Sequence, residues 1–404
     1  MSTVERTLRP VPRARPAPLG RLAAAVLERV LPAIEGGTLV VRLPDGSERW
    51  FGSGPEHLFE IRDRRFFARI ATRPKLALGE AYQQGEWTSD DLPGVLGLLL
   101  RNSLAGRERH PLLRRLADAR PRVNRRTGLL AARRNIEYHY DLGNELFAAF
   151  LDETMTYSCA IYEHEGESLV EAQRRKLRRA CEKLSLGPED HVLEIGCGWG
   201  SFALTAAGEY GARVTAATIS PSQAQLARAR VAAAGLADRV DIVERDFREL
   251  EGCYTRIASI EMLEAVGERL WRPFFSACDR LLAPGGRVCV QTILVPDARF
   301  PRYRKSVDWI ERYIFPGCLI PSLAALREAS QGASRLALRD REEIGTGYAP
   351  TLAAWRERFH ERIVHVRRLG YDERFVRTWD FYLASCEALF RVGLLGDAQL
   401  VFER

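Results

Sequence analysis

The chain has 404 residues, enough for two domains that each bury a hydrophobic core. Hydrophobic residues make up 46% of it and charged residues 28%, a composition typical of globular proteins. No apolar run in the sequence approaches the roughly 18–20 residues that span a bilayer, and the N-terminus lacks the pattern of a secretory signal. We therefore expect a protein that stays in the cytoplasm.

The eight cysteines are scattered singly along the chain. They form no C-x-x-C pair, and no histidine lies near them at the spacing of metal ligands. This pattern predicts neither a disulfide framework nor a zinc site, so we expect no metal.

The net charge of +7 is unevenly distributed, with a marked excess of arginine between Arg101 and Arg134. Arginine suits phosphate, so nucleic acid, anionic lipid headgroups and plain solvent are all compatible surroundings for this segment. The chain has no N-P-P-[YF]-type motif for base amines and no RNA-binding signature. We therefore expect no nucleic-acid partner.

The N-terminal part of the chain predicts a small α+β domain. Residues 1–18 combine proline with arginine and are predicted to be disordered. Apolar residues at helical spacing predict a helix over 19–34, and residues 38–43 and 48–51, separated by Pro44-Asp45-Gly46, predict a β-hairpin. The domain is assigned to residues 19–104, and the basic segment 105–134 to a linker.

From about residue 135 to the end at 404, helices alternate with apolar strands, which is typical of a parallel sheet with crossover helices. We expect strands at 191–195, 213–218, 240–243, 256–260 and 287–293, followed by a late pair at 335–339 and 399–403.

A glycine turn follows the first of these strands, in the segment Glu194-Ile195-Gly196-Cys197-Gly198-Trp199-Gly200. Glycines at this point let the backbone approach a ligand closely at the carboxyl end of a strand. The spacing is G-x-G-x-G, after the acidic Glu194, rather than the G-x-G-x-x-G of dinucleotide binders.

The ends of the next two strands argue against NAD. Where a dehydrogenase has an acid for the ribose, this chain has Thr218 and Gln223. The third strand is followed by Asp246 and Phe247, which can accept a hydrogen bond from adenine and stack on it. The fold class predicted is α/β, a Rossmann-like class I methyltransferase sheet of seven strands that ends in an antiparallel hairpin, preceded by the smaller N-terminal domain.

Several segments together resemble the cyclopropane-fatty-acyl-phospholipid synthases and the mycolic-acid cyclopropane synthases, which are S-adenosylmethionine-dependent methyltransferases. The matching segments are His139–Asn144, Thr156–Ala160, Glu194–Gly200, Glu261–Gly267, Tyr313–Gly317 and Tyr382–Arg391. Gly79–Trp87 is similar to the N-terminal lipid-contacting domain of the two-domain members. The resemblance covers nearly the whole chain.

Carried over position by position, the resemblance implies a set of contacts to S-adenosylmethionine. They fall on Tyr157, Ser158, Gly196, Gly198, Thr218, Gln223, Asp246 and Phe247.

The resemblance also implies a bound bicarbonate that acts as the base. Its holders would be the backbone of Cys159 and Ile293 together with Glu264 and Tyr348. This chain has Gln291 and Ala265 where many bacterial synthases have histidine, and the glutamine can still donate a hydrogen bond. Cys386, which has been regarded in this family as a nucleophile, is expected to line the acyl site instead.

The implied reaction transfers a methyl(ene) group from S-adenosylmethionine to the double bond of an unsaturated acyl chain in a phospholipid. The carbocation that results, which aromatic faces can stabilise, loses a proton to bicarbonate and closes to a cyclopropane. This product is favoured because Glu264, Ile293 and Tyr348 are retained and ring closure needs no reductant. Gln291 and Ala265 keep open an alternative, in which the same methyl transfer gives a methylene- or methyl-branched chain, or a diene precursor of a furan, with a separate reductase.

The same resemblance places the enzyme at the inner face of the membrane as a peripheral protein, and a homodimer is compatible with it. A lipid-binding protein without activity is a third alternative, which the intact glycine turn and Glu264 oppose.

Overall fold

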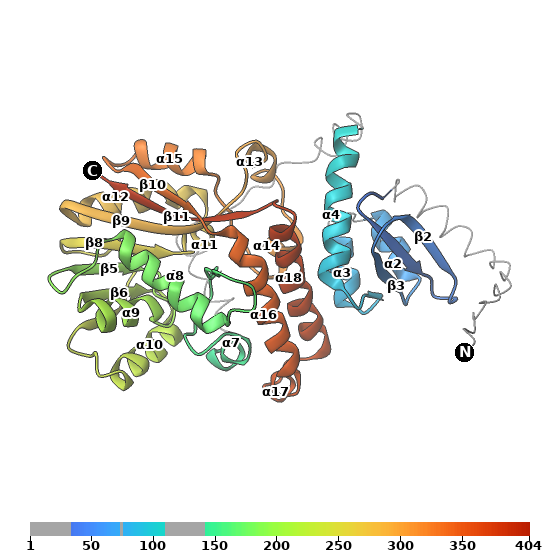
Figure 1. Cartoon of the computed structure of the whole chain (residues 1–404), viewed down its shortest axis with the longest axis horizontal. Helices are drawn as coiled ribbons and strands as arrows, with labels where there is room; N and C mark the ends of the chain where they lie inside the picture. Colours follow the sequence, from blue (N-terminus) through green and yellow to red (C-terminus); the bar gives the residue numbers. More distant parts are fainter. Residues whose placement is uncertain (1–33, 73–75, 110–141) are drawn as a thin grey trace, which may run out of the picture.

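The computed structural model describes residues 34–72, 76–109 and 142–404 (Figure 1). The disorder predicted for residues 1–18, almost all of the helix predicted over 19–34 and most of the basic linker therefore lie outside the described residues.

The N-terminal domain is a four-stranded sheet covered by helices. The strands are β1 (Gly37–Arg42), β2 (Glu48–Ser53), β3 (Glu56–Ile61) and β4 (Trp87–Thr88), in the order β2-β1-β3-β4. The predicted hairpin is present, since β1 pairs antiparallel with β2, and β3 returns parallel to β1. The helices are α2 (Arg65–Thr72), α3 (Ala77–Gln83) and α4 (Leu92–Arg109). Because α4 continues to Arg109, the first residues of the predicted linker are helical.

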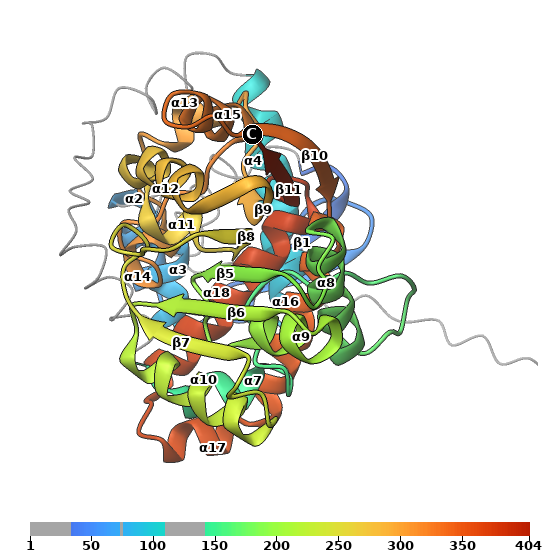
Figure 2. The ribbon, with the colours of Figure 1, turned by 90° about the vertical axis from the view of Figure 1, so that its left-hand side faces the viewer.

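The second sheet has seven strands in the order β10-β11-β9-β8-β5-β6-β7 (Figure 2). All seven strands predicted from the sequence are present, several of them longer than expected. They are β5 (His191–Ile195), β6 (Arg213–Thr218), β7 (Val240–Glu244), β8 (Tyr254–Ile260), β9 (Leu282–Leu294), β10 (Ala337–Glu343) and β11 (Gly396–Glu403). Strands β5 to β9 pair in parallel, and β11 pairs antiparallel with both β9 and β10.

Helices bury both faces of this sheet, which is why its strands are nearly continuously apolar. On one face pack α8 (Leu169–Lys183), α9 (Ser201–Tyr210) and α10 (Pro221–Ala233). On the other pack α11 (Leu263–Val266), α12 (Glu268–Leu281) and α15 (Leu323–Gln331). Neighbouring residues of β5 separate accordingly, with Val192 in the first core and Leu193 in the second.

Most of the remaining helices form a third core beside the sheet. They are α7 (Asn144–Phe150), α14 (Trp309–Tyr313), α16 (Tyr348–Glu361), α17 (Ile363–Arg368) and α18 (Glu373–Arg391), with a 3-10 turn, η1 (Gly345–Gly347), before α16. The short helix α13 (Phe300–Tyr303) packs with α11 and α12 instead. Within the part of the chain that the structure describes, no helix is long and apolar enough to cross a membrane.

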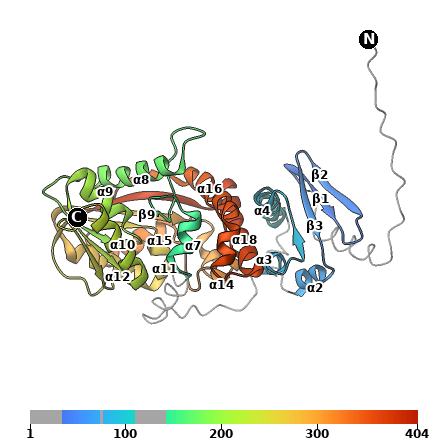
Figure 3. The same cartoon turned by 90° about the horizontal axis from the view of Figure 1, so that it is seen from below.

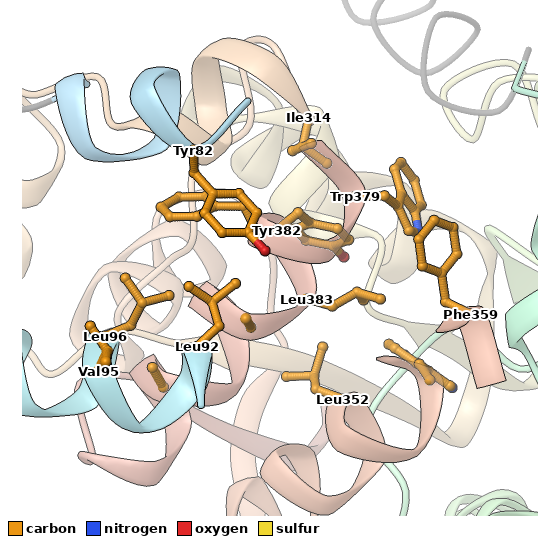
Figure 4. Close-up of a cluster of buried hydrophobic side chains, with 14 of the residues drawn as sticks. Tyr82, Leu92, Val95, Leu96, Ile314, Leu352, Phe359, Trp379, Tyr382 and Leu383 are labelled. Atoms are coloured by element: carbon orange, nitrogen blue, oxygen red, sulfur yellow. The ribbon is translucent and has the colours of Figure 1, made fainter. Parts of the chain in front are cut away.

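Helix α18 joins the two domains. It lies against α3 and α4 on one side and against α16 on the other (Figure 3). Figure 4 shows Tyr82, Leu92 and Leu96 of the N-terminal domain facing Tyr382 and Leu383 of α18 in one apolar cluster. The two domains therefore share a core, so the N-terminal domain is packed over this surface against the domain that contains the seven-stranded sheet.

A buried carboxylate holds this interface electrostatically. Asp380 of α18 accepts hydrogen bonds from the Tyr82 hydroxyl (2.5 Å), the Arg356 guanidinium (2.6 Å) and the His360 ring (2.8 Å). Burial by itself would raise the pKa of Asp380, but the hydrogen bond from His360 and the charge on Arg356 lower it to about 2.

We predict that Asp380→Asn lowers the free energy of unfolding by about 3 kcal/mol at neutral pH, because Arg356 and Tyr82 lose a buried anion. The stabilisation exists above the ordinary aspartate pKa of about 3.9 and is lost as the pH falls through the folded value. Urea titrations at different pH should therefore show the free energies of unfolding of the wild type and of Asp380→Asn converging as the pH falls from about 3.9 to about 2. Glu373→Gln, which breaks an exposed pair with Arg367, is the matched control and should change little. Equal destabilisation by both variants would contradict this role.

Candidate active site

A pocket lies at the carboxyl ends of β5, β6 and β8, where open α/β sheets bind ligands. The glycine turn after β5 forms one wall. Gly196, Gly198 and Gly200 have φ values of 84°, 52° and 83°, conformations that L-residues with a Cβ rarely adopt. A Cβ at Gly198 would meet no protein atom within 4 Å, so its backbone faces open space.

The second wall comes from the segment that precedes α8. Tyr157 and Ser158 line the pocket, and the Ser158 hydroxyl accepts a hydrogen bond from the buried Lys176 ammonium at 2.6 Å. Asn144 ties this region to the glycine turn, because its side-chain oxygen accepts from the Trp199 indole at 2.8 Å.

The ends of β6 and β7 supply the third wall. Thr218 donates to the side-chain oxygen of Gln223 at 2.8 Å, and both residues line the pocket. Asp246 also lines it and forms a two-point contact with the Arg248 guanidinium. The buried Phe247 completes this wall. The structure thus brings together all eight residues expected to contact S-adenosylmethionine.

Glu194 lines the same pocket with a buried carboxyl. One of its oxygens, Oε2, has no hydrogen-bond partner among the described residues. Burial raises the pKa of Glu194 to about 8. An unpartnered buried acceptor beside a glycine turn with open space in front of it fits a polar cofactor, and S-adenosylmethionine would be held here by the eight residues and Glu194.

The most densely bonded acid of the site is Glu261, directly after β8. Its Oε1 accepts from the Cys159 backbone N–H at 2.7 Å and from the Gln291 amide at 2.8 Å. Its Oε2 accepts from the Tyr348 hydroxyl at 2.6 Å. Glu261 has a φ of 48°, a strained backbone conformation of the kind that clusters at functional sites. The Glu261 carboxylate therefore accepts hydrogen bonds from three of the donors that were expected to surround bicarbonate.

Glu264 accepts a hydrogen bond from the remaining expected donor, the backbone N–H of Ile293. Its Oε1 accepts from the Ile293 backbone N–H at 2.5 Å and from the Thr292 hydroxyl at 2.8 Å. Burial and, secondarily, the charge of Glu261 raise the pKa of Glu264 to about 8. The four expected anion holders are thus all present. However, the donors of Cys159 and Tyr348 are bonded to the Glu261 carboxyl, and the backbone N–H of Ile293 is bonded to the Glu264 carboxyl.

A side-chain amide pair fixes the orientation of Gln291. Gln399 of β11 lies opposite Gln291 on β9 and donates to its Oε1 at 3.1 Å. Because that oxygen accepts from Gln399, the NH₂ group of Gln291 points to Glu261. Burial raises the pKa of the Cys159 thiol well above its ordinary value, so its contribution here is its backbone N–H.

Aromatic side chains adjoin the pocket. The Tyr157 ring lies 5.1 Å from Trp355 and 5.4 Å from Phe147, centroid to centroid, and the Tyr157 hydroxyl bonds to that of Tyr382 at 2.6 Å. Such faces stabilise a cation without attacking it. Cys386 is half-buried on α18 against the third core and is not among the pocket residues; burial raises the pKa of its thiol.

Three residues of the site, namely Glu261, Lys176 and Asp397, were not predicted from the sequence. Glu261 had a readable signal, since it is an acid at the carboxyl end of a buried strand. Lys176 stands between buried positions of an amphipathic helix and is fully buried. Asp397 has no comparable signal in the sequence, because it depends on the pairing of β11 with β9.

The comparisons with known proteins identify the family. Residues 129–400 match the family model described as mycolic acid cyclopropane synthetase. The chain belongs to this family. It is 42% identical over 350 residues to the tuberculostearic acid methyltransferase of Mycobacterium tuberculosis, an alignment that covers 84% of this chain and 81% of the relative. It is 35% identical to the cyclopropane-fatty-acyl-phospholipid synthase of Escherichia coli K12, over 87% of this chain and 89% of the relative.

Among solved structures, the mycolic acid cyclopropane synthase CmaA1 in complex with SAH and CTAB is similar, with a TM-score of 0.62 and 28% identity. The match covers 67% of this chain and 98% of that one. The protein is thus an S-adenosylmethionine-dependent methyltransferase with the class I sheet.

We predict that Gly198→Val abolishes binding of S-adenosylmethionine while the fold is retained, because the new side chain would enter the space in front of the glycine turn. Calorimetric titration with the cofactor is the measurement. Gly235→Val is the matched control, since Gly235 also has a positive φ (68°) and no protein atom near its Cβ position, but lies in the turn after α10. Unchanged affinity of the Gly198 variant for S-adenosylmethionine would show that the cofactor does not bind against the glycine turn.

Proposed function

We propose that this methyltransferase adds a methyl group to the double bond of an unsaturated acyl chain in a phospholipid, and that Glu261 is the base. In this reaction the product is a methylene-branched chain, which a separate reductase converts to a methyl branch. The observation that carries the proposal is the Glu261 carboxylate, bonded to Cys159, Gln291 and Tyr348.

The contacts of Glu261 suit a base. All three partners are donors, which stabilises the ionised carboxylate that a base requires. These are the donors expected to hold bicarbonate. A bicarbonate ion would therefore be repelled by the negative charge of Glu261 and would find these donors already bonded to the Glu261 carboxylate. In this chain the base is therefore a side chain of the protein, Glu261, and not a bound ion.

Bound S-adenosylmethionine would supply the methyl group, with the electrons of the S–CH3 bond staying on sulfur as S-adenosylhomocysteine, and the alkene provides the electron pair for the new carbon–carbon bond. A secondary cation remains on the neighbouring carbon of the chain. A 1,2-hydride shift from the methylated carbon moves the charge to that more substituted carbon. Glu261 then takes a proton from the added methyl, and the electrons of the broken C–H bond form the C=CH₂ double bond of the branch. No oxidant or reductant is consumed.

One further consideration supports the branched product over the ring. The relative that is 42% identical is named a tuberculostearic acid methyltransferase and not a cyclopropane synthase.

Cyclopropane formation with bicarbonate as the base is the second candidate. It is favoured by the presence of Glu264, Ile293 and Tyr348 in the site and by the 35% identity to a cyclopropane-fatty-acyl-phospholipid synthase. The N-terminal domain, packed on α18, would then contact the lipid in either case, with the enzyme at the inner membrane surface.

We predict that the purified enzyme, given S-adenosylmethionine and an unsaturated phospholipid without bicarbonate or reductant, yields a methylene-branched chain. The ring and the methylene product have equal mass, so proton NMR must distinguish vinylidene from cyclopropane protons. Added bicarbonate should leave the rate unchanged. If the NMR spectrum shows only cyclopropane protons and the rate depends on bicarbonate, this proposal is wrong and the second candidate is supported.

Glu261 allows a sharper test. Glu261→Gln should bind S-adenosylmethionine normally and lose about 10²- to 10⁴-fold in turnover, because the base is gone. Glu261→Gly suits the positive φ and opens space beside the three donors, so added bicarbonate or formate should restore part of its activity. The glutamine variant, whose amide fills that space, is the control and should not respond. Wild-type turnover in Glu261→Gln would exclude Glu261 as the base.

A further inference from the structure

A second carboxyl group lies against Glu261 and has no role in the reaction described so far. Asp397 is the second residue of β11 and is fully buried, with an exposed fraction of 0%. Its side chain faces the Glu261 carboxyl. Within the described residues, neither of its oxygens accepts a hydrogen bond from any donor.

The sheet determines where this side chain points. Asp397 and Gln399 are two residues apart on β11 and therefore project from the same face. Gln399 bonds to Gln291 and to the Lys176 carbonyl, which identifies that face as the one toward α8 and the site. Ala398 and Leu400 point into the opposite core.

Asp397 is buried and Glu261 is half-buried. Two carboxyl groups in contact away from bulk water cannot both be ionised without a large cost, so such a pair retains a proton. The hydrogen bonds indicate which member carries it. Glu261 is surrounded by donors, which favour an anion, whereas Asp397 has no donor and thus nothing to stabilise a negative charge. A protonated Asp397 would itself become a donor to Glu261.

The other charged groups around the pair agree with a single negative charge. Lys176 of α8 faces both Asp397 and Glu261, and burial lowers its pKa to about 8, so near neutral pH its charge balances one carboxylate. Glu264 of α11 adds negative potential from the other side. Tyr348 of α16 and the Cys159 thiol also face Asp397, and the pKa of each is raised, mainly by burial, so both are neutral.

We propose that Asp397 holds a proton and donates it as a hydrogen bond to Glu261, which positions Glu261 as an ionised base. Asp397 is a positioning residue, since it acts through Glu261, and the inference rests on the proposed role of Glu261. Burial, followed by the charge of Glu261, raises the pKa of Asp397 well above its usual range, in keeping with this assignment.

The first test observes the proton directly and needs no activity. Infrared spectra of the full-length protein should show the carbonyl stretch of a protonated carboxylic acid at a pH well above 8, where Glu194 and Glu264, each with a pKa of about 8, are ionised. Asp397→Asn should remove this band. The control Asp241→Asn, at an exposed position of β7, should leave it in place. A band that persists in Asp397→Asn overturns the proposal.

The second test separates positioning from a merely structural role. Asn at 397 keeps a donor for Glu261, so Asp397→Asn should retain clearly more turnover near neutral pH than Asp397→Leu. Asp397→Leu removes the donor and should lose about 10- to 100-fold, the worth of one hydrogen bond to a charged group.

The outcomes distinguish the two proposals. If Glu261→Gln keeps its turnover, the proposed base fails, whereas the infrared band of Asp397 still decides where the proton lies. If Asp397→Asn loses as much activity as Asp397→Leu, the proton-holding role of Asp397 is wrong while Glu261 stands as the base.

Discussion

The site depends on holding one negative charge, that of the half-buried Glu261, beside the pocket. An isolated carboxylate in such a place is costly unless hydrogen bonds satisfy it. Glu261 meets this requirement with donors from three separate segments, at Cys159, Gln291 and Tyr348. A loop, a central strand and a helix of the third core must therefore converge on one point. Their convergence explains why so much of the catalytic domain is built around the end of β8.

The same requirement explains the strain at Glu261. A positive φ directly after a strand is unfavourable for a residue with a Cβ, and it persists only where surrounding contacts impose it. Here the backbone N–H of Glu261 donates to the Gln291 carbonyl at 2.8 Å while its side chain accepts from the Gln291 amide. The residue is thus anchored to β9 at both its backbone and its side chain, which fixes the carboxylate beside the cofactor pocket.

Helix α18 connects this chemistry to the N-terminal domain. Its Tyr382 bonds to Tyr157 at the pocket, and two residues earlier its Asp380 bonds to Tyr82 of the N-terminal domain. A side chain that faces the cofactor wall and one that holds the other domain therefore lie on one rigid element. In the proposed reaction, an acyl chain delivered by the N-terminal domain would meet a pocket whose aromatic lining is set by the same helix.

Much of this protein was determined by its sequence. Apolar runs and glycines are local signals, and they placed all seven strands, the β1–β2 hairpin and the glycine turn after β5, because close backbone approach and strand burial depend on residue type at a position. The resemblance of several segments to a known family implied the eight residues that line one pocket in the structure. Only the tertiary structure decided which acid meets the anion donors, because Glu261 and Glu264 are three residues apart and differ only in where their side chains point. Asp397 becomes part of the site through the antiparallel pairing of β11 with β9, a contact between residues about a hundred positions apart that no local pattern encodes.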